Sequence, residues 1–119
     1  MITGIDHVQV AIPRGGEDTA RSFYGDLLNM TEVEKPPALA VRGGCWFTAG
    51  SAVLHLGVEE PFAPARKAHP AFLVEDLDAL QASLEAAGSA CTRSDGELPG
   101  VHRFHTHDPF GNRIEFQQA

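Results

Sequence analysis

The chain has no apolar run that approaches the ~20 residues a membrane-spanning helix needs. Its first residues, MITGIDHVQVAI, lack the basic segment and small-residue cleavage site of a signal peptide. There are only two cysteines, Cys45 and Cys91, and they do not have CxxC spacing. We interpret them as two buried thiols in a reduced compartment. Together these absences predict a cytoplasmic protein without a membrane span.

Basic residues are also scarce. Nine Lys and Arg residues face 16 Asp and Glu residues, which gives a formal net charge of −7. This balance argues against nucleic acid or an anionic membrane as the main partner, because both require a basic surface. Six histidines against only two lysines is an unusual ratio for an acidic domain, and it is the first indication of a functional site.

The order of predicted elements repeats once along the chain, which has the length of one domain. Residues 58–68, with two prolines and mixed charge, are predicted to be a linker between module 1–57 and module 69–119. The first module is expected to contain a strand, a helix and three further strands, at 5–12, 17–30, 31–35, 40–49 and 52–57. The second is expected to repeat this order at 69–74, 76–88, 90–93, 101–107 and 112–117. Asp76 is expected to cap the second helix and Gly88 to end it. The predicted class is α+β, with two βαβββ modules.

The candidate metal ligands occupy equivalent places in the two modules. His7 and His69 open the first strand of each module, whereas His55 and Glu115 lie in the last strand of each. Alternation along each strand places apolar residues on the helix-covered face and all four candidates on the opposite face. We therefore expect the four side chains to point into one cavity.

The closing hairpin predicts which residues are neighbours of Glu115. Residues 107–113, HDPFGNR, have the Asp-Pro and Gly-Asn pairs of a tight turn with a left-handed residue. This turn predicts three facing pairs: His107 with Arg113, His105 with Glu115, and Arg103 with Gln117. A histidine and an arginine would then lie beside the carboxylate on the cavity wall.

Three motifs resemble one known family. The opening strand reads IDHVQVAI, the first helix contains FYGDLLNM, and the chain closes on DPFGNRIEF. Together they resemble the vicinal oxygen chelate superfamily, which includes glyoxalase I, extradiol dioxygenases, methylmalonyl-CoA epimerase, fosfomycin-resistance thiol transferases and bleomycin-binding proteins. The resemblance spans essentially the whole chain, and it is specific for the superfamily but not for one reaction. We expect the two modules to form a U-shaped, largely antiparallel sheet around one cavity, in a homodimer.

The resemblance also implies a site for one divalent metal ion. The family's ligands come from the first and last strands of its modules, and they match His7, His69 and Glu115. Glyoxalase I takes a fourth ligand, a glutamate, at the position of His55, and this departure lowers the expectation of glyoxalase I activity. His55 is either a fourth ligand or a wall residue that binds substrate. Two histidines and a carboxylate suit iron, zinc, nickel or manganese and leave open positions for a chelating substrate.

The candidate catalytic residues are Glu115, His105 and Arg103. His105 is interpreted as a general base or a partner that orients the carboxylate, and the alternative is a polar lining residue. Arg103 is a candidate for holding a carboxylate or enolate oxygen, and the alternative is an exposed ion pair. Trp46 either lines the pocket or packs in the core.

Two classes of function follow from this site. The first is a small metal-dependent enzyme of glyoxalase or dioxygenase type, whose substrate chelates the metal through two adjacent oxygens. The second is a binding protein without chemistry, like the bleomycin-sequestering members, which generally lack the metal triad. The triad favours the enzyme. A fosfomycin-type thiol transferase is less favoured, because residues 92–100 are nearly neutral and that subgroup needs a cationic loop.

Overall fold

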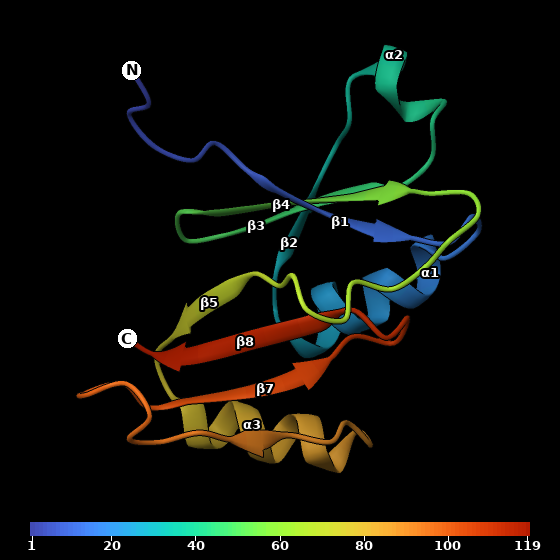
Figure 1. Ribbon diagram of the computed structural model, residues 1–119. Helices are drawn as coiled ribbons and strands as arrows, with labels where there is room; N and C mark the ends of the chain where they lie inside the picture. The colour runs from blue at the N-terminus through green and yellow to red at the C-terminus, as the bar shows by residue number, and fades with distance from the viewer. The chain divides into compact units, whose positions relative to one another are not determined.

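The computed structural model describes all 119 residues, and the chain divides into two compact units, Met1–Pro64 and Ala65–Ala119. Each unit contains one four-stranded mixed sheet, with strand orders β1-β4-β3-β2 and β5-β8-β7-β6 (Figure 1). In both sheets the first strand pairs in parallel with the last, and the other neighbours pair antiparallel. The α+β class is therefore confirmed, and each unit has the element order expected of a βαβββ module. No helix of the structure has the length and apolar character needed to cross a membrane.

The first unit contains the elements β1 (Val8–Ile12), α1 (Glu17–Ala20), η1 (Arg21–Leu27), β2 (Thr31–Val33), α2 (Pro37–Ala40), β3 (Cys45–Ala49) and β4 (Ala52–Val58). The predicted strand 40–49 was wrong in its first half, where helix α2 and a turn lie instead. Pro37 begins this helix, a position that proline favours because no amide hydrogen is needed there. Gly44 then has a φ of +81°, and a Cβ on it would lie 2.1 Å from the carbonyl oxygen of Leu56. Only glycine fits this close approach at the start of β3.

The predicted helix 17–30 exists, but its geometry changes along its length. One α-helical turn is followed by the π-helical segment η1, and the Leu28 amide donates to the Phe23 carbonyl five residues earlier, at 2.9 Å. One face of this helical segment is buried, since Ala20, Phe23 and Tyr24 are almost fully covered. This helix therefore supplies much of the core of the first unit.

The second unit contains β5 (Ala71–Val74), α3 (Leu77–Ala86), β6 (Thr92–Arg93), β7 (Arg103–His107) and β8 (Arg113–Gln118). Figure 1 shows α3 running alongside the sheet of this unit. The side chain of Asp76 caps the helix by accepting a hydrogen bond from the Ala79 amide at 3.0 Å, as predicted. Gly88, with a φ of +95°, follows the helix at the predicted stop. Leu77 and Leu84 are the buried part of its apolar stripe.

The predicted alternation of faces is confirmed in the central strands. In β4, Leu54 and Leu56 are fully buried while His55 between them is partly exposed. In β7, Phe104 and Thr106 are likewise buried, between partly exposed neighbours. The predicted strand starts were wrong at two ligand candidates, however. His7 lies just before β1, and His69 lies two residues before the start of β5.

Candidate metal centre

One face of the second sheet has three rows of paired polar side chains from β7 and β8. The hairpin of β7 and β8 has the predicted register, with His107 opposite Arg113, His105 opposite Glu115, and Arg103 opposite Gln117. Its turn is held by Asp108, whose Oδ1 accepts hydrogen bonds from two backbone amides, and by Gly111 at a φ of +93°. Because side chains alternate along a strand, all six paired residues share one face of the sheet. Glu115 therefore lies in the middle row.

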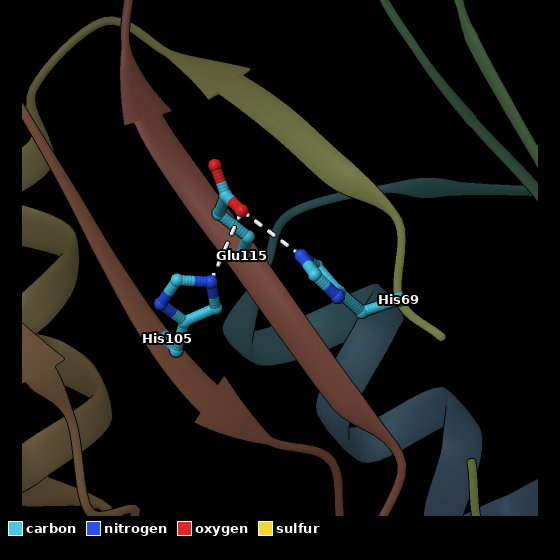
Figure 2. Close-up of side chains that lie close together, drawn as sticks. All are labelled: His69, His105 and Glu115. Carbon is cyan, nitrogen blue, oxygen red and sulfur yellow. Dashed lines mark hydrogen bonds and ion pairs between the residues drawn. The ribbon is translucent and has the colours of Figure 1, made fainter. Parts of the chain in front are cut away.

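Three side chains converge on this middle row. Nε2 of His69 and Nε2 of His105 lie 2.9 and 3.0 Å from the same carboxylate oxygen, Oε1 of Glu115 (Figure 2). His105 comes from β7, Glu115 from β8, and His69 from the segment that precedes β5. One ligand atom from each lies within 4.8 Å of the other two, so these three residues could hold one metal ion. Glu115 is only 4% exposed, and the centre is thus sheltered from water at its carboxylate.

The hydrogen bonds of His69 favour a cation at this point. Its Nδ1 lies 2.9 Å from the carbonyl oxygen of Lys67, and because a carbonyl only accepts, Nδ1 carries the proton. In the neutral ring, Nε2 then has its lone pair directed at a carboxylate oxygen 2.9 Å away. Two acceptors at this distance need a proton or a metal ion between them. A backbone carbonyl that fixes the ring in this tautomer is the usual outer partner of a metal-binding histidine.

Glu115 is held as a carboxylate. Burial is the largest single effect on its pKa and raises it, but hydrogen bonds from Gln117 and Arg103 and the positive charge of Arg103 oppose burial, and the pKa is lowered to about 2. The Gln117 amide donates to Oε2 at 2.5 Å, and the Arg103 guanidinium lies 3.4 Å from both carboxylate oxygens. The charged form is the one that binds a metal ion.

His105 is held in its neutral form. Burial lowers the pKa of its ring, the nearby positive charge of Arg113 lowers it further, and Glu115 opposes both effects. A neutral imidazole can accept a proton from a bound molecule or bind a metal ion through its free nitrogen. The sequence assigned His105 to proton transfer or to orienting the carboxylate, and the structure adds it to the group that could hold the ion.

The centre opens into a pocket of about 530 Å³, and every residue that lines it belongs to the second unit. Besides the three converging side chains, Lys67, Glu97, Arg103 and Arg113 contribute charged groups to its wall. Ser94 and the exposed Glu97, in the loop that follows β6, are also part of this lining.

The remaining candidates, His7 and His55, lie together in the first unit. The ring of His55 is stacked between two others, with centroids 3.9 Å from Trp46 and 3.9 Å from His7. Burial lowers the pKa of His55, and His7 lowers it further. Nδ1 of His7 lies 2.9 Å from the carboxylate of Asp6, which leaves Nε2 as its possible ligand atom. The structure therefore groups His7 with His55, and their roles as metal ligands remain predictions.

Sequence reasoning did not select Lys67, Arg113 or Gln117 as site residues. The hairpin register gave a signal for two of them, because it placed Arg113 and Gln117 on the face of Glu115. No such signal existed for Lys67, because this residue lies in the predicted linker. Its place at the site depends on backbone hydrogen bonds that Lys67 and nearby Ala65 make with His69 and Arg113.

Comparisons with known proteins agree with the fold. A glyoxalase family protein from Bacillus anthracis is 50% identical, with a TM-score of 0.93 over 99% of this chain and 96% of that one. Lactoylglutathione lyase from Agrobacterium tumefaciens is 21% identical, with a TM-score of 0.74 over 99% and 95%. The fosfomycin resistance protein FosX from Listeria monocytogenes is 13% identical, with a TM-score of 0.79 over 100% and 95%. A search of curated proteins found no match.

The family model described as Glyoxalase/Bleomycin resistance protein/Dioxygenase superfamily matches residues 4–116. This range includes most of both units and the three side chains of the metal centre. It agrees with the resemblance of the opening strand and the closing hairpin. The chain therefore belongs to the glyoxalase/bleomycin resistance protein/dioxygenase superfamily.

Proposed function

We propose that the protein is a metal-dependent enzyme of glyoxalase or dioxygenase type, acting on a small substrate that chelates the ion through two adjacent oxygens. The observation that carries the proposal is the arrangement of His69, His105 and Glu115 around a single point. Two imidazoles and one carboxylate are a donor set for iron, zinc, nickel or manganese. Three protein ligands leave coordination positions open, which distinguishes a catalytic site from a closed structural one.

The residues present fit such an ion for two reasons. The Nδ1 proton of His69 is fixed on the Lys67 carbonyl, so Nε2 is the free ligand atom and faces Glu115. Glu115 is kept ionised by its hydrogen-bond donors, so no proton competes strongly at its oxygens. His7 and His55 are further ligand candidates on the family pattern. A bound ion would supply Lewis acidity toward the two oxygens of a chelating substrate.

The chain's own residues have three tasks in this proposal. Arg103, whose Nε is buried without a hydrogen-bond partner, supplies a donor for an oxygen that gains negative charge. His105, whose pKa is lowered by burial, is neutral at physiological pH and would supply one ring nitrogen to the ion. Gln117 and Arg103 keep the Glu115 carboxylate in place through their hydrogen bonds.

A second candidate function is a binding protein without chemistry, which the superfamily also contains. The buried and fully hydrogen-bonded carboxylate favours the enzyme, because binding an organic molecule alone does not require a buried charge surrounded by two histidines. A screen of the metal-loaded protein against glutathione hemithioacetals, catechols and acyl-CoA thioesters separates the two. Tight binding of one class without turnover would favour the binding protein.

Metal content tests the proposal directly. Protein purified without chelators should contain close to one divalent ion per chain by elemental analysis, and His69→Ala and Glu115→Ala should each lose most of it. The matched control is His102→Ala, because the His102 side chain is 61% exposed and lies outside the pocket lining. Equal metal content in all four proteins would contradict the site.

A further inference from the structure

The pocket has a charge opposite to that of the protein. Three cationic side chains, Lys67, Arg103 and Arg113, line it against two carboxylates, Glu97 and Glu115. The lining is therefore positive by one charge before any metal ion is added, whereas the whole chain has a net charge of −7. A positive cavity in an acidic protein attracts anions to that cavity in preference to the rest of the surface.

The three cations differ in what already neutralises them. Arg103 lies 3.2 Å from Glu97 and 3.4 Å from Glu115, so its charge is shared with two carboxylates. Lys67 and Arg113 form no ion pair with any carboxylate in the structure. Two positive groups that line the same pocket, both without a counter-ion, can bind a negatively charged group of a ligand.

Backbone hydrogen bonds attach the segment that contains Lys67 to the start of β8, where Arg113 lies. The buried Asn112 accepts a hydrogen bond from the Ala65 amide at 2.9 Å, and the Arg113 amide donates to the Ala65 carbonyl at 2.9 Å. The carbonyl of Lys67 accepts the Nδ1 proton of His69. The segment of Lys67 is therefore held at one end by β8 and at the other by a residue of the metal centre.

The geometry of β8 gives the distance between Arg113 and the metal centre. Arg113 and Glu115 are two residues apart on the same face of β8, which corresponds to about 7 Å along the strand. A substrate that reaches both points is short. Its chelating oxygens and its negative group are separated by a few bonds.

We infer that Arg113 and Lys67 bind a carboxylate or phosphoryl group of the substrate, so that the pocket selects an anionic molecule whose acidic group lies a few bonds from its two chelating oxygens. This inference rests on the proposed function for the chelating end, but the anion site itself depends only on Arg113 and Lys67. The planar guanidinium of Arg113 suits two oxygens of the acidic group, and the Lys67 ammonium supplies a point charge beside it.

Calorimetric titration of the chelator-treated full chain with inorganic phosphate and, separately, with acetate tests the anion site without a metal ion. The wild type should bind at least one of the two, and the preferred anion identifies the group as phosphoryl or carboxylate. Arg113→Gln and Lys67→Gln should each weaken this binding roughly tenfold to a hundredfold, the usual effect of one charged hydrogen bond. The matched control Arg66→Gln changes an exposed neighbour outside the pocket lining and should stay within about twofold of the wild type.

The metal-loaded protein provides a second comparison. Catechol and 3,4-dihydroxybenzoate share one chelating group and differ by a carboxylate, so the wild type should prefer the latter about tenfold and Arg113→Gln should abolish the preference. Metal content should be the same in both proteins, because Arg113 is not a ligand. No anion binding by the wild type, or equal anion binding in all variants, would overturn the inference. Loss of metal in the His69 and Glu115 variants would still support the metal site separately.

Discussion

Asn112 connects the closing hairpin to the segment that precedes β5, and Asn112→Ala should destabilise the second unit strongly. The side chain is 1% exposed. Its Nδ2 donates to the Asp108 carboxylate at 2.9 Å, and its Oδ1 accepts from the Ala65 amide at 2.9 Å. A buried hydrogen bond to a charged group contributes about 1.5–3 kcal/mol, and a neutral one contributes about 1 kcal/mol. The expected loss in the free energy of unfolding is therefore about 2.5–4 kcal/mol. A domain of this size has about 5–15 kcal/mol, so the variant still folds.

Urea unfolding at pH 7, followed by circular dichroism, measures this loss. Amide hydrogen exchange at Ala65 gives a local readout, because its amide loses its only partner and should exchange much faster in the variant. The matched control is Gln81→Ala, whose side chain accepts one hydrogen bond from Arg93 near the surface and should contribute less than about 0.5 kcal/mol. A loss below about 1 kcal/mol for Asn112→Ala, with unchanged protection of Ala65, would refute this reasoning.

Three further outcomes are expected. Gly44→Ala should destabilise the fold by about 3 kcal/mol or more in urea, because its Cβ would collide with backbone; Gly50→Ala, also at positive φ but in open space, should cost only about 1 kcal/mol. Alkylation by iodoacetamide at pH 8, followed by mass spectrometry, should be slowest at Cys45, because burial raises the pKa of its thiol to about 11 and keeps it protonated below that pH. Burial also raises the pKa of Cys91, but this thiol is more exposed and should react sooner. Equal alkylation rates at the two cysteines would contradict this prediction. His55→Ala should weaken the near-ultraviolet circular dichroism of the single tryptophan and cost about 0.5–1.5 kcal/mol, because the stacked ring holds the indole in one orientation; an unchanged spectrum would count against the stack.

Local periodicity explains why much of the fold was predictable. A strand repeats every two residues, so the sequence determines which face of β4 buries Leu54 and which exposes His55. The turn residues of the closing hairpin likewise determined which residues face each other across β7 and β8. A hairpin turn of fixed length allows only one pairing register between its two strands. Residues 107–113 alone therefore predicted that His105 lies opposite Glu115.

Local rules failed where two signals competed. Residues 40–44 contain apolar residues suited to a strand, but Pro36 and Pro37 fix backbone angles that begin a helix. The π-helical turn at 21–27 was also missed, because its hydrogen bonds differ from those of an α-helix by one residue and its apolar spacing is nearly the same. In both cases the sequence pattern was compatible with more than one backbone geometry.

The sequence by itself determined the class, the repeated order of elements, and the strand faces on which His55 and Glu115 lie. The tertiary structure alone decided which nitrogen of His69 faces Glu115, because that depends on the carbonyl of Lys67. It also decided that Lys67 and Arg113 line one pocket, since the Lys67 segment is attached to β8 by hydrogen bonds between Ala65 and residues 112–113, almost 50 positions apart. Periodicity specifies the direction of a side chain from its own strand, whereas the partner that it meets depends on distant backbone, and only the folded chain brings that backbone into place.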